Sequence, residues 1–352
     1  MIRGKQRPWS DAELQILKEE YPTLGVDAMM AKLQRTRDSI FNKAQQLKLK
    51  YTGPVFHVER APEPPCVTEL IERRIREFEE VKVIKDPRQR GIVIETQWRG
   101  PIALGFIGDP HLDDRGMDMA SFRRDCDLLN SRPNILAGNI GDLVNNWIGS
   151  LARLHGEQNT TQDQALKLIE WMCGLVPWGW IILGNHDLWN EVVRHVAKTA
   201  APTAAIVPHG AQFLIRGAGY EVRLEARHDH PGRSMYNAAH GQLRANYRGS
   251  PCHIHVGGHI HEGAYTLTRN AYSGVTGHSI RLGSYKVYDD YAEAKGYKGG
   301  GLAPSCLCVV DPTKDESDTG FINVFFDLED GIHFLDKLQE KYDALNGDRL
   351  TG

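Results

Sequence analysis

Five short segments of this sequence carry side chains that can bind metal ions, and each follows an apolar, strand-like run. In chain order they are Asp109-Pro110-His111, Gly141-Asp142, Gly184-Asn185-His186-Asp187, His228-Asp229-His230 and Gly258-His259-Ile260-His261. Each segment alone is more typical of a surface turn or a structural histidine. Together they supply carboxylates, imidazoles and one amide, a mixed donor set that suits zinc, manganese or iron rather than calcium.

These segments must be brought together by the strands that precede them. In open α/β sheets the loops at the strand ends converge on one edge, and sites form there. A D-x-H or H-x-H step directs alternate residues of an extended chain to the same side, so both can reach one metal cluster. We therefore expect an α/β chain in which five strand ends meet.

The five segments resemble the pattern of calcineurin-like metallophosphoesterases, which runs D-x-H, G-D-x-x-D, G-N-H-D/E, H and G-H-x-H. The resemblance covers roughly residues 102 to 265. It implies an α/β (α+β) fold, a β-sandwich of two mixed sheets flanked by helices. It also implies two divalent metal ions (manganese, zinc or iron), whose ligands would be Asp109, His111, Asp142, Asn185, His228, His259 and His261.

The resemblance also implies a role for individual residues. Asp142 would bridge the two ions, and His186 would lie beside the substrate phosphate as an acid or electrostatic stabiliser. Asp187 would orient the ring of His186. Two cations a few ångströms apart can share a hydroxide, lower its pKa and neutralise charge on the phosphate oxygens. His186 can then protonate the departing alkoxide.

Two positions of the pattern leave alternatives open. For the fourth segment we prefer His228, which directly follows its strand; His230 has the same parity, and His240 is a third candidate. Asn145 stands where the family often has Asp, a position usually outside the metal ligands. That change weakens any match to Ser/Thr protein phosphatases, whose pattern continues V-D-R-G and uses G-N-H-E.

The first 52 residues predict a separate helical module. Ser10 and Glu13 form an S-x-x-E capping box, Tyr21-Pro22 is expected to end that helix, and further helices are expected at about 27–33 and 37–48. Residues 1 to 50 hold ten Lys or Arg and six Asp or Glu. The pattern W-S-x-x-E-L with RTRDSIFNKAQQLKL resembles Myb/SANT-like helix-turn-helix modules, with a helical docking or oligomerisation module as the alternative. The implied DNA contacts are Arg35, Arg37, Ser39, Lys43 and Gln46.

Composition sets the remaining boundaries. Residues 53–66, with four Pro and one Gly, are expected to be a linker. Residues 67–352 would form the catalytic domain, opening with a helix at about 67–82 and ending with a hairpin around Glu329-Asp330-Gly331 and a closing helix. Arg269, Arg281 and Lys286 are expected to be ordinary surface charges, with phosphate contact as the alternative.

The bulk composition excludes several other classes of protein. The net charge is −3, and the six Cys include no CxxC pair, which argues against a disulfide framework and a thiolate zinc site. The sequence contains no stretch of about 18 apolar residues, so no membrane span is predicted. The N-terminus lacks the apolar core of a signal peptide. We therefore expect a cytoplasmic protein; the oligomeric state is not given by the sequence.

The leading hypothesis is a dinuclear phosphoesterase with a metal-bridging hydroxide, acting on DNA as a phosphodiesterase or nuclease. The layout is similar to that of phage-encoded metallophosphoesterases, which would place it in the host cytoplasm. One alternative is a phosphomonoesterase or small-molecule phosphodiesterase with an N-terminal assembly module. Another is a DNA-binding regulator with an inactive phosphoesterase domain, but the complete ligand set argues against it.

Overall fold

The structure of the chain is a computed structural model that describes residues 7–54, 66–85, 91–156, 158–288 and 303–347. It divides into two compact units, Met1–Glu80 and Val81–Gly352. Most of the predicted linker, residues 55–65, lies outside the described residues. The boundaries predicted at residues 52/53 and 66/67 therefore remain untested. No helix of the described residues is long and apolar enough to cross a membrane.

The first unit opens with two helices around a small core. The first is α1 (Asp11–Leu33), whose capping box at Ser10 and Glu13 forms as predicted, and the second is α2 (Arg37–Gln46). The first helix does not end at Tyr21-Pro22 but continues to Gly25, where φ is 77° and the helix kinks. Gly25 takes this left-handed φ without steric cost. The helix α1 therefore consists of two helical segments, and the second includes the helix predicted at about 27–33.

A third helix, α3 (Val67–Lys85), follows in the chain. It includes the predicted helix at about 67–82 and extends it by three residues. Its described side chains are mostly exposed.

The second unit is built on two six-stranded mixed sheets. Sheet A has the order β1 (Gly91–Glu95), β6 (Gly210–Gly217), β7 (Tyr220–Arg227), β8 (Ile254–Gly257), β10 (Thr276–Arg281) and β9 (Ala264–Arg269). Sheet B has the order β12 (Ile322–Phe325), β11 (Ser305–Val310), β2 (Ile102–Ile107), β3 (Ile135–Asn139), β4 (Trp178–Leu183) and β5 (Ala205–Pro208). Strands β2 to β5 are parallel neighbours, as are β7, β8 and β10. The predicted fold class is confirmed.

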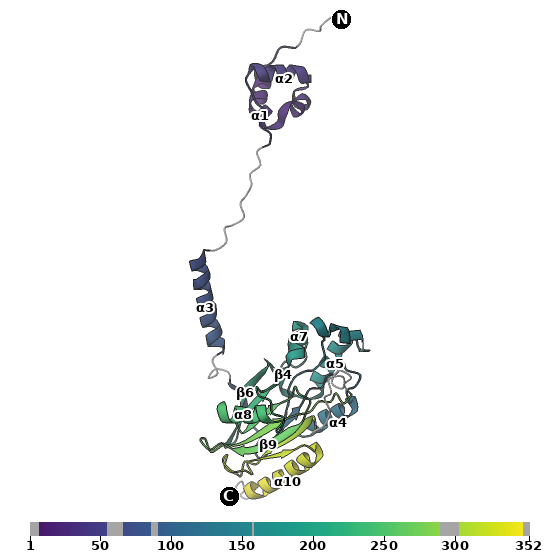
Figure 1. Ribbon diagram of the computed structural model, residues 1–352, viewed down its shortest axis with the longest axis vertical. Helices are drawn as coiled ribbons and strands as arrows, with labels where there is room; N and C mark the ends of the chain where they lie inside the picture. The colour runs from purple at the N-terminus through teal and green to yellow at the C-terminus, as the bar shows by residue number, and fades with distance from the viewer. Residues whose placement is uncertain (1–6, 55–65, 86–90, 157, 289–302, 348–352) are drawn as a thin grey trace. The chain divides into compact units, whose positions relative to one another are not determined.

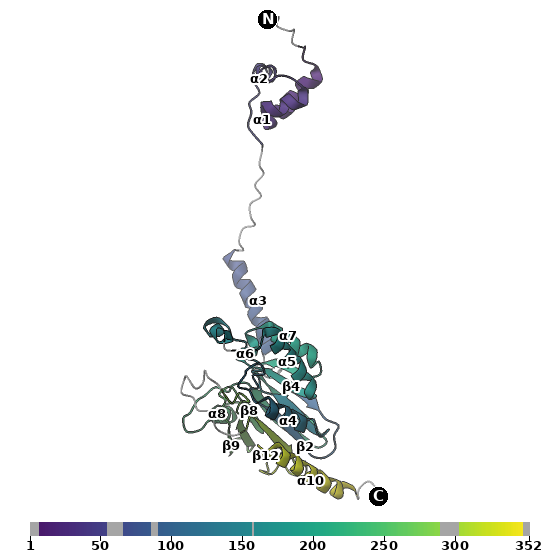
Figure 2. The same cartoon turned by 90° about the vertical axis from the view of Figure 1, so that its right-hand side faces the viewer.

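Alternating side chains of the two sheets form the core between them. Phe106 and Trp180 from sheet B pack in one cluster with Leu224, Ile254 and Ile280 from sheet A. The other face of sheet B is covered by α4 (Met119–Leu129), α5 (Gln162–Leu175), α7 (Glu191–Ala200) and α10 (Leu328–Gly347). In the second unit these helices lie on one side of the sandwich, while α8 (His240–Arg248) lies against β8 and β10 on the other (Figures 1 and 2).

The prediction of a hairpin around Glu329-Asp330-Gly331 is wrong. These residues form the first turn of α10. The Asp327 side chain accepts hydrogen bonds from the backbone N–H groups of Glu329 and Asp330, at 2.9 and 3.1 Å, and so caps the helix start. An Asp at this position satisfies N–H groups that otherwise lack a partner; the cap therefore outweighs the turn tendency of the following Asp-Gly.

Candidate metal centre

The five predicted segments lie at neighbouring strand ends of the two sheets. Segments one to three follow β2, β3 and β4, which are adjacent in sheet B. Segments four and five follow β7 and β8, which are adjacent in sheet A. Because these strands run parallel within each sheet, their carboxyl ends share one edge. The site is thus assembled from both halves of the sandwich.

One group of ligand atoms converges on the imidazole Nε2 of His228. This atom lies 3.1 Å from Asp142 Oδ2, 3.1 Å from Asn185 Oδ1 and 3.1 Å from His259 Nδ1. The ligand atoms of Asp142, His228 and His259 all lie within 4.8 Å of one another. One N–H of the His228 ring cannot donate to Asp142, Asn185 and His259 at the same time. One cation, however, can bind the lone pairs of all four side chains together.

A second group faces the first across Asp142. The Nε2 atoms of His111 and His261 lie 3.1 Å apart, and His111 Nε2 lies 4.0 Å from Asp142 Oδ2. The Asp142 carboxylate therefore stands between the His111–His261 pair and the His228 group, the position that a bridging ligand requires.

Asp109 is fully buried between these loops. One carboxylate oxygen, Oδ2, accepts the His259 backbone N–H at 2.6 Å, and the other, Oδ1, lies 3.3 Å from His228 Nδ1. Among the described residues, Oδ1 accepts no hydrogen bond. A buried carboxylate oxygen without a donor is costly unless a cation binds it, so Asp109 suits the donor set.

Of the three candidates in the fourth segment, His228 alone is placed among these atoms. The ring of His230 is buried, with Nε2 donating to the Val256 carbonyl at 3.1 Å, and burial lowers its pKa to about 3. His240 is the first residue of α8. These contacts favour His228 as the ligand.

The ring of His186 is oriented by a backbone carbonyl and not by Asp187. Its Nδ1 donates to the Asn145 carbonyl, which directs Nε2 towards Asp142 Oδ2 at 4.0 Å. The carboxylate of Asp187 accepts the backbone N–H groups of Leu143 and Gly184 instead, both at 2.9 Å. The expected contact between Asp187 and the ring is wrong: this buried carboxylate ties the second and third loops together.

Backbone strain is concentrated at the candidate ligands. Non-glycine residues rarely adopt a positive φ because Cβ crowds the backbone. Here φ is 46° at His111, 53° at Asp142, 71° at His259 and 57° at His261. Strained residues persist only where the surrounding structure holds them, and they gather at functional sites. The strain therefore supports a functional role for the three loops that carry these four residues.

The charges of the cluster are strongly coupled. Burial raises the pKa of Asp109 to about 7, against the opposing effect of His228. Burial alone would lower the pKa of His228, but Asp142 and then Asp109 raise it to about 10. Burial would likewise raise the pKa of Asp142, but the His228 charge holds it below its ordinary value. The carboxylates of Asp142 and Asp109 thus favour positive charge at the position of the His228 ring.

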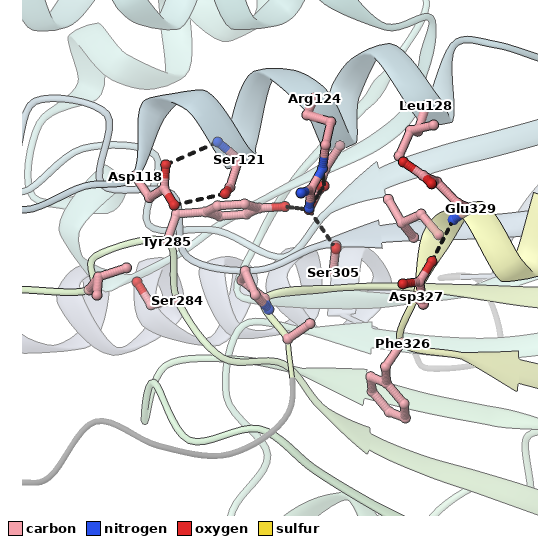
Figure 3. A pocket seen from close by; sticks show the side chains of 15 residues that line it. Asp118, Ser121, Arg124, Leu128, Ser284, Tyr285, Ser305, Phe326, Asp327 and Glu329 are labelled. Atoms are coloured by element: carbon pink, nitrogen blue, oxygen red, sulfur yellow. Dashed lines mark hydrogen bonds and ion pairs between the residues drawn. The ribbon is translucent and has the colours of Figure 1, made fainter.

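A hydrogen-bonded network behind the first loop was not predicted from the sequence. Ser284 Oγ donates to the Asp109 carbonyl at 2.7 Å, and the Tyr285 backbone N–H donates to it at 3.3 Å. The Tyr285 and Ser305 hydroxyls both donate to the buried Asp125 carboxylate, at 2.7 Å each, along a cavity of about 400 Å³ beside α4 (Figure 3). This network fixes the first loop from behind.

Aromatic and basic side chains around His186 were also missed. The ring centroid of Trp189 lies 4.3 Å from that of His186, and the Trp147 centroid lies 5.1 Å away. Lys286 pairs with Asp114 at 3.0 Å and lies 5.3 Å from the Trp147 ring centre. Lys286 is 8% exposed and Arg281 is 2% exposed, so neither is the surface charge that was expected. Arg269 is exposed.

In the first unit, Arg35 does not fit its predicted role as a DNA contact. Its guanidinium pairs with Glu13 at 2.9 Å, donates to the Arg7 and Pro8 carbonyls, and stacks 4.1 Å from the Trp9 ring centre. These contacts and its nearly buried side chain make Arg35 part of the module's own structure. The other predicted contacts lie on α2, where Arg37 and Gln46 are exposed and Ser39 and Lys43 are half-buried.

No family model and no curated protein matches this chain. Among solved structures it is similar to Vps29 of Chaetomium thermophilum (16% identity, 64% of this chain and 91% of that one, TM-score 0.33). It is also similar to a metallophosphoesterase of Sphaerobacter thermophilus (14%, 60% and 84%, TM-score 0.32) and to the calcineurin-like phosphoesterase YfkN of Bacillus subtilis (12%, 69% and 99%, TM-score 0.34). At these low scores, the geometry of the site itself has to support a function.

Proposed function

We propose that this chain is a metal-dependent phosphoesterase that holds two divalent cations. The observation that carries the proposal is the position of Asp142, whose Oδ2 lies 3.1 Å from His228 Nε2 and 4.0 Å from His111 Nε2. One ion would be held by Asp109, His111, Asp142 and His261, and the other by Asp142, Asn185, His228 and His259. Imidazole, carboxylate and amide donors suit manganese, zinc or iron.

The cations, when bound, would supply an activated water and neutralise charge on the phosphate oxygens. The chain itself supplies the proton donor. Because the Asn145 carbonyl holds Nδ1 of His186, its Nε2 is directed at the cluster. A proton on this nitrogen can pass to the departing oxygen of the ester. Trp147 and Trp189 flank the ring and limit its rotation.

We further propose that the substrate is a phosphodiester, with DNA as the natural source. The support is the helical first unit, on which α2 presents Arg37, Lys43 and Gln46 along one helix. A linked DNA-binding module would raise the local concentration of phosphodiesters at the metal centre. The proposal of DNA as the substrate therefore depends on DNA binding by the first unit.

Metal content tests the centre directly. The purified chain should bind two transition-metal ions, and Asp142→Ala should lose both because it removes the shared carboxylate. Asp163→Ala, which removes an exposed carboxylate in the first turn of α5, is the matched control. A wild type that takes up no ion from manganese, zinc or iron solutions would refute the proposed function.

Substrate class is tested by comparing bis-p-nitrophenyl phosphate with p-nitrophenyl phosphate. We expect the diester to be hydrolysed faster; faster monoester hydrolysis would favour the phosphomonoesterase alternative. For DNA binding, Lys43→Glu on α2 should weaken salt-sensitive binding, and Lys18→Glu on α1 should weaken it much less. Equal effects of the two variants would contradict a DNA contact through α2.

A further inference from the structure

Helix α3 presents a continuous apolar stripe to solvent. The exposed fractions are 72% for Val67, 54% for Ile71, 57% for Ile75, 65% for Phe78 and 47% for Val81. Steps of three and four residues keep these side chains on one face of a helix. Extended apolar surfaces of this kind usually mark an interaction site.

Four of the five stripe residues fit the spacing of a coiled-coil seam, with Arg74 at the fifth seam position and Ile75 beside it. Positions 67, 71, 74, 78 and 81 follow each other at alternating steps of four and three, which places Ile71 and Phe78 at a and Val67, Arg74 and Val81 at d. The single polar seam residue, Arg74, pairs with Glu77 at 2.8 Å in its own helix. In a parallel pair Arg74 would meet Arg74 of the other copy, so this seam position lowers the stability of the pair.

The flanking positions distinguish a parallel pair from an antiparallel one. In a parallel pair, each g residue meets the e residue five positions later in the partner. This places Leu70 against Ile75 and Glu77 against Lys82 of the other copy, an apolar contact and an opposite-charge contact. In a fully overlapped antiparallel pair, Glu77 would face Glu77 of the other copy, which is repulsive.

We propose that α3 pairs with α3 of a second copy of this chain as a parallel two-stranded coiled coil. The apolar stripe provides the buried seam, and the charges at positions 77 and 82 select the partner and its direction. The inference is independent of the proposed phosphoesterase function, because no residue of α3 belongs to the metal centre.

The mass of the full chain tests the pairing. Sedimentation equilibrium across a range of micromolar concentrations should give twice the chain mass of 39.5 kDa. The double variant Ile71→Glu/Phe78→Glu should be monomeric, whereas Arg76→Glu, on the exposed opposite face of α3, should remain dimeric. Far-UV circular dichroism checks that the two units stay folded; the substituted side chains are exposed, so their folding does not depend on them.

Direction is tested with Cys66, which is exposed and directly precedes α3, while the other five cysteines are buried. In a parallel pair, the two Cys66 thiols lie together, and mild oxidation should link the copies. In an antiparallel pair, about 28 Å of helix would separate them. Cys66→Ser should abolish the link.

Charge reversal gives a further check. Glu77→Lys and Lys82→Glu should each weaken the dimer, and the double variant should restore it. A wild type that is monomeric at every concentration would overturn the proposal. A dimer that survives Ile71→Glu/Phe78→Glu, or one that never links through Cys66, would overturn it as well.

Discussion

The Nε2 atoms of His111 and His261 lie 3.1 Å apart, although 150 positions separate the residues in the chain. Burial lowers the pKa of His111, so its ring is neutral and presents a lone pair. His111 follows a strand of sheet B and His261 follows a strand of sheet A. Two imidazoles that face each other across the sandwich, His111 with its lone pair available, are well placed to share a cation, and several predictions about the neighbouring residues can be tested.

Substitution of His186 should separate catalysis from metal binding. His186→Gln removes the proposed proton donor while leaving the candidate ligands in place, so we expect hydrolysis of the diester to fall by about 10²- to 10⁴-fold. Metal content should stay at the wild-type level. The control is His195→Gln, which replaces an exposed histidine of α7. A full rate in His186→Gln would show that the leaving group departs without this residue.

Gly184 should be indispensable because of its close approach to Asp142. A Cβ at position 184 would lie 2.1 Å from Asp142 Oδ1 and 2.7 Å from the Asp142 backbone nitrogen. Gly184→Ala must therefore displace the Asp142 carboxylate, and we expect loss of bound metal. Gly174→Ala in α5 meets nothing within 4 Å and should raise stability by up to about 1 kcal/mol through helix propensity. Normal metal content in Gly184→Ala would contradict the bridging role.

Ser284 should tune metal affinity from outside the ligand set. Its hydroxyl donates to the Asp109 carbonyl and accepts the Lys286 backbone N–H at 3.0 Å. Losing these bonds in Ser284→Ala should raise the metal Kd about 2- to 10-fold, as measured by competition with a chelating dye. Ser121→Ala, which removes a hydroxyl bonded to Asp118 in the same cavity, should leave the Kd unchanged. Equal metal Kd values for Ser284→Ala and Ser121→Ala would contradict the inference that Ser284 positions Asp109.

Buried histidines should make the second unit sensitive to acid. Burial lowers the pKa of His278 from 6.5 to about 4. The unfolded chain then binds the proton more readily than the folded one, so the stabilisation is complete above pH 6.5 and is lost as the pH falls towards 4. The loss from His278 should reach about 3 kcal/mol. Urea unfolding at a series of pH values should show a shallower acid dependence for His278→Gln.

The control for this experiment is His333→Gln, which replaces an exposed residue of α10. Its unfolding free energy should follow the wild-type pH dependence. If His278→Gln also follows that dependence, the buried ring does not couple folding to protonation. Tyr265 donates its hydroxyl to His278 Nδ1 at 3.0 Å, and a glutamine oxygen can accept the same bond, so the comparison isolates the titration.

The sequence predicted the parts of the site that depend on strand ends. Polar residues after apolar runs placed Asp109, Asp142, Asn185 and the paired histidines on one edge, because β-strand direction determines where a following loop emerges. It could not assign the partner of His186, since the Asn145 carbonyl is a backbone atom with no signature in the residue types. The same limit applies to Ser284, whose contact joins residues 175 positions apart.

Composition alone also gave a wrong prediction for a charged residue that stabilises the fold. Arg35 belongs to a basic stretch, but it pairs with Glu13 of the capping box, a long-range contact that charge counting cannot reveal. Likewise, Pro22 was expected to end the first helix, but the chain continues to Gly25, and Thr52 donates to the Pro22 carbonyl at 2.8 Å. Local propensity gave way here to tertiary contacts.

The division of the candidate ligands between two sheets has a consequence for assembly. Neither sheet alone carries a complete set, since His228, His259 and His261 follow strands of sheet A and the other ligands follow strands of sheet B. A half-formed sandwich would have no high-affinity place for an ion. An ion that binds after the two sheets have packed would link sheet A to sheet B and slow their separation. The fraction of chains with bound metal would then equal the fraction that has completed folding.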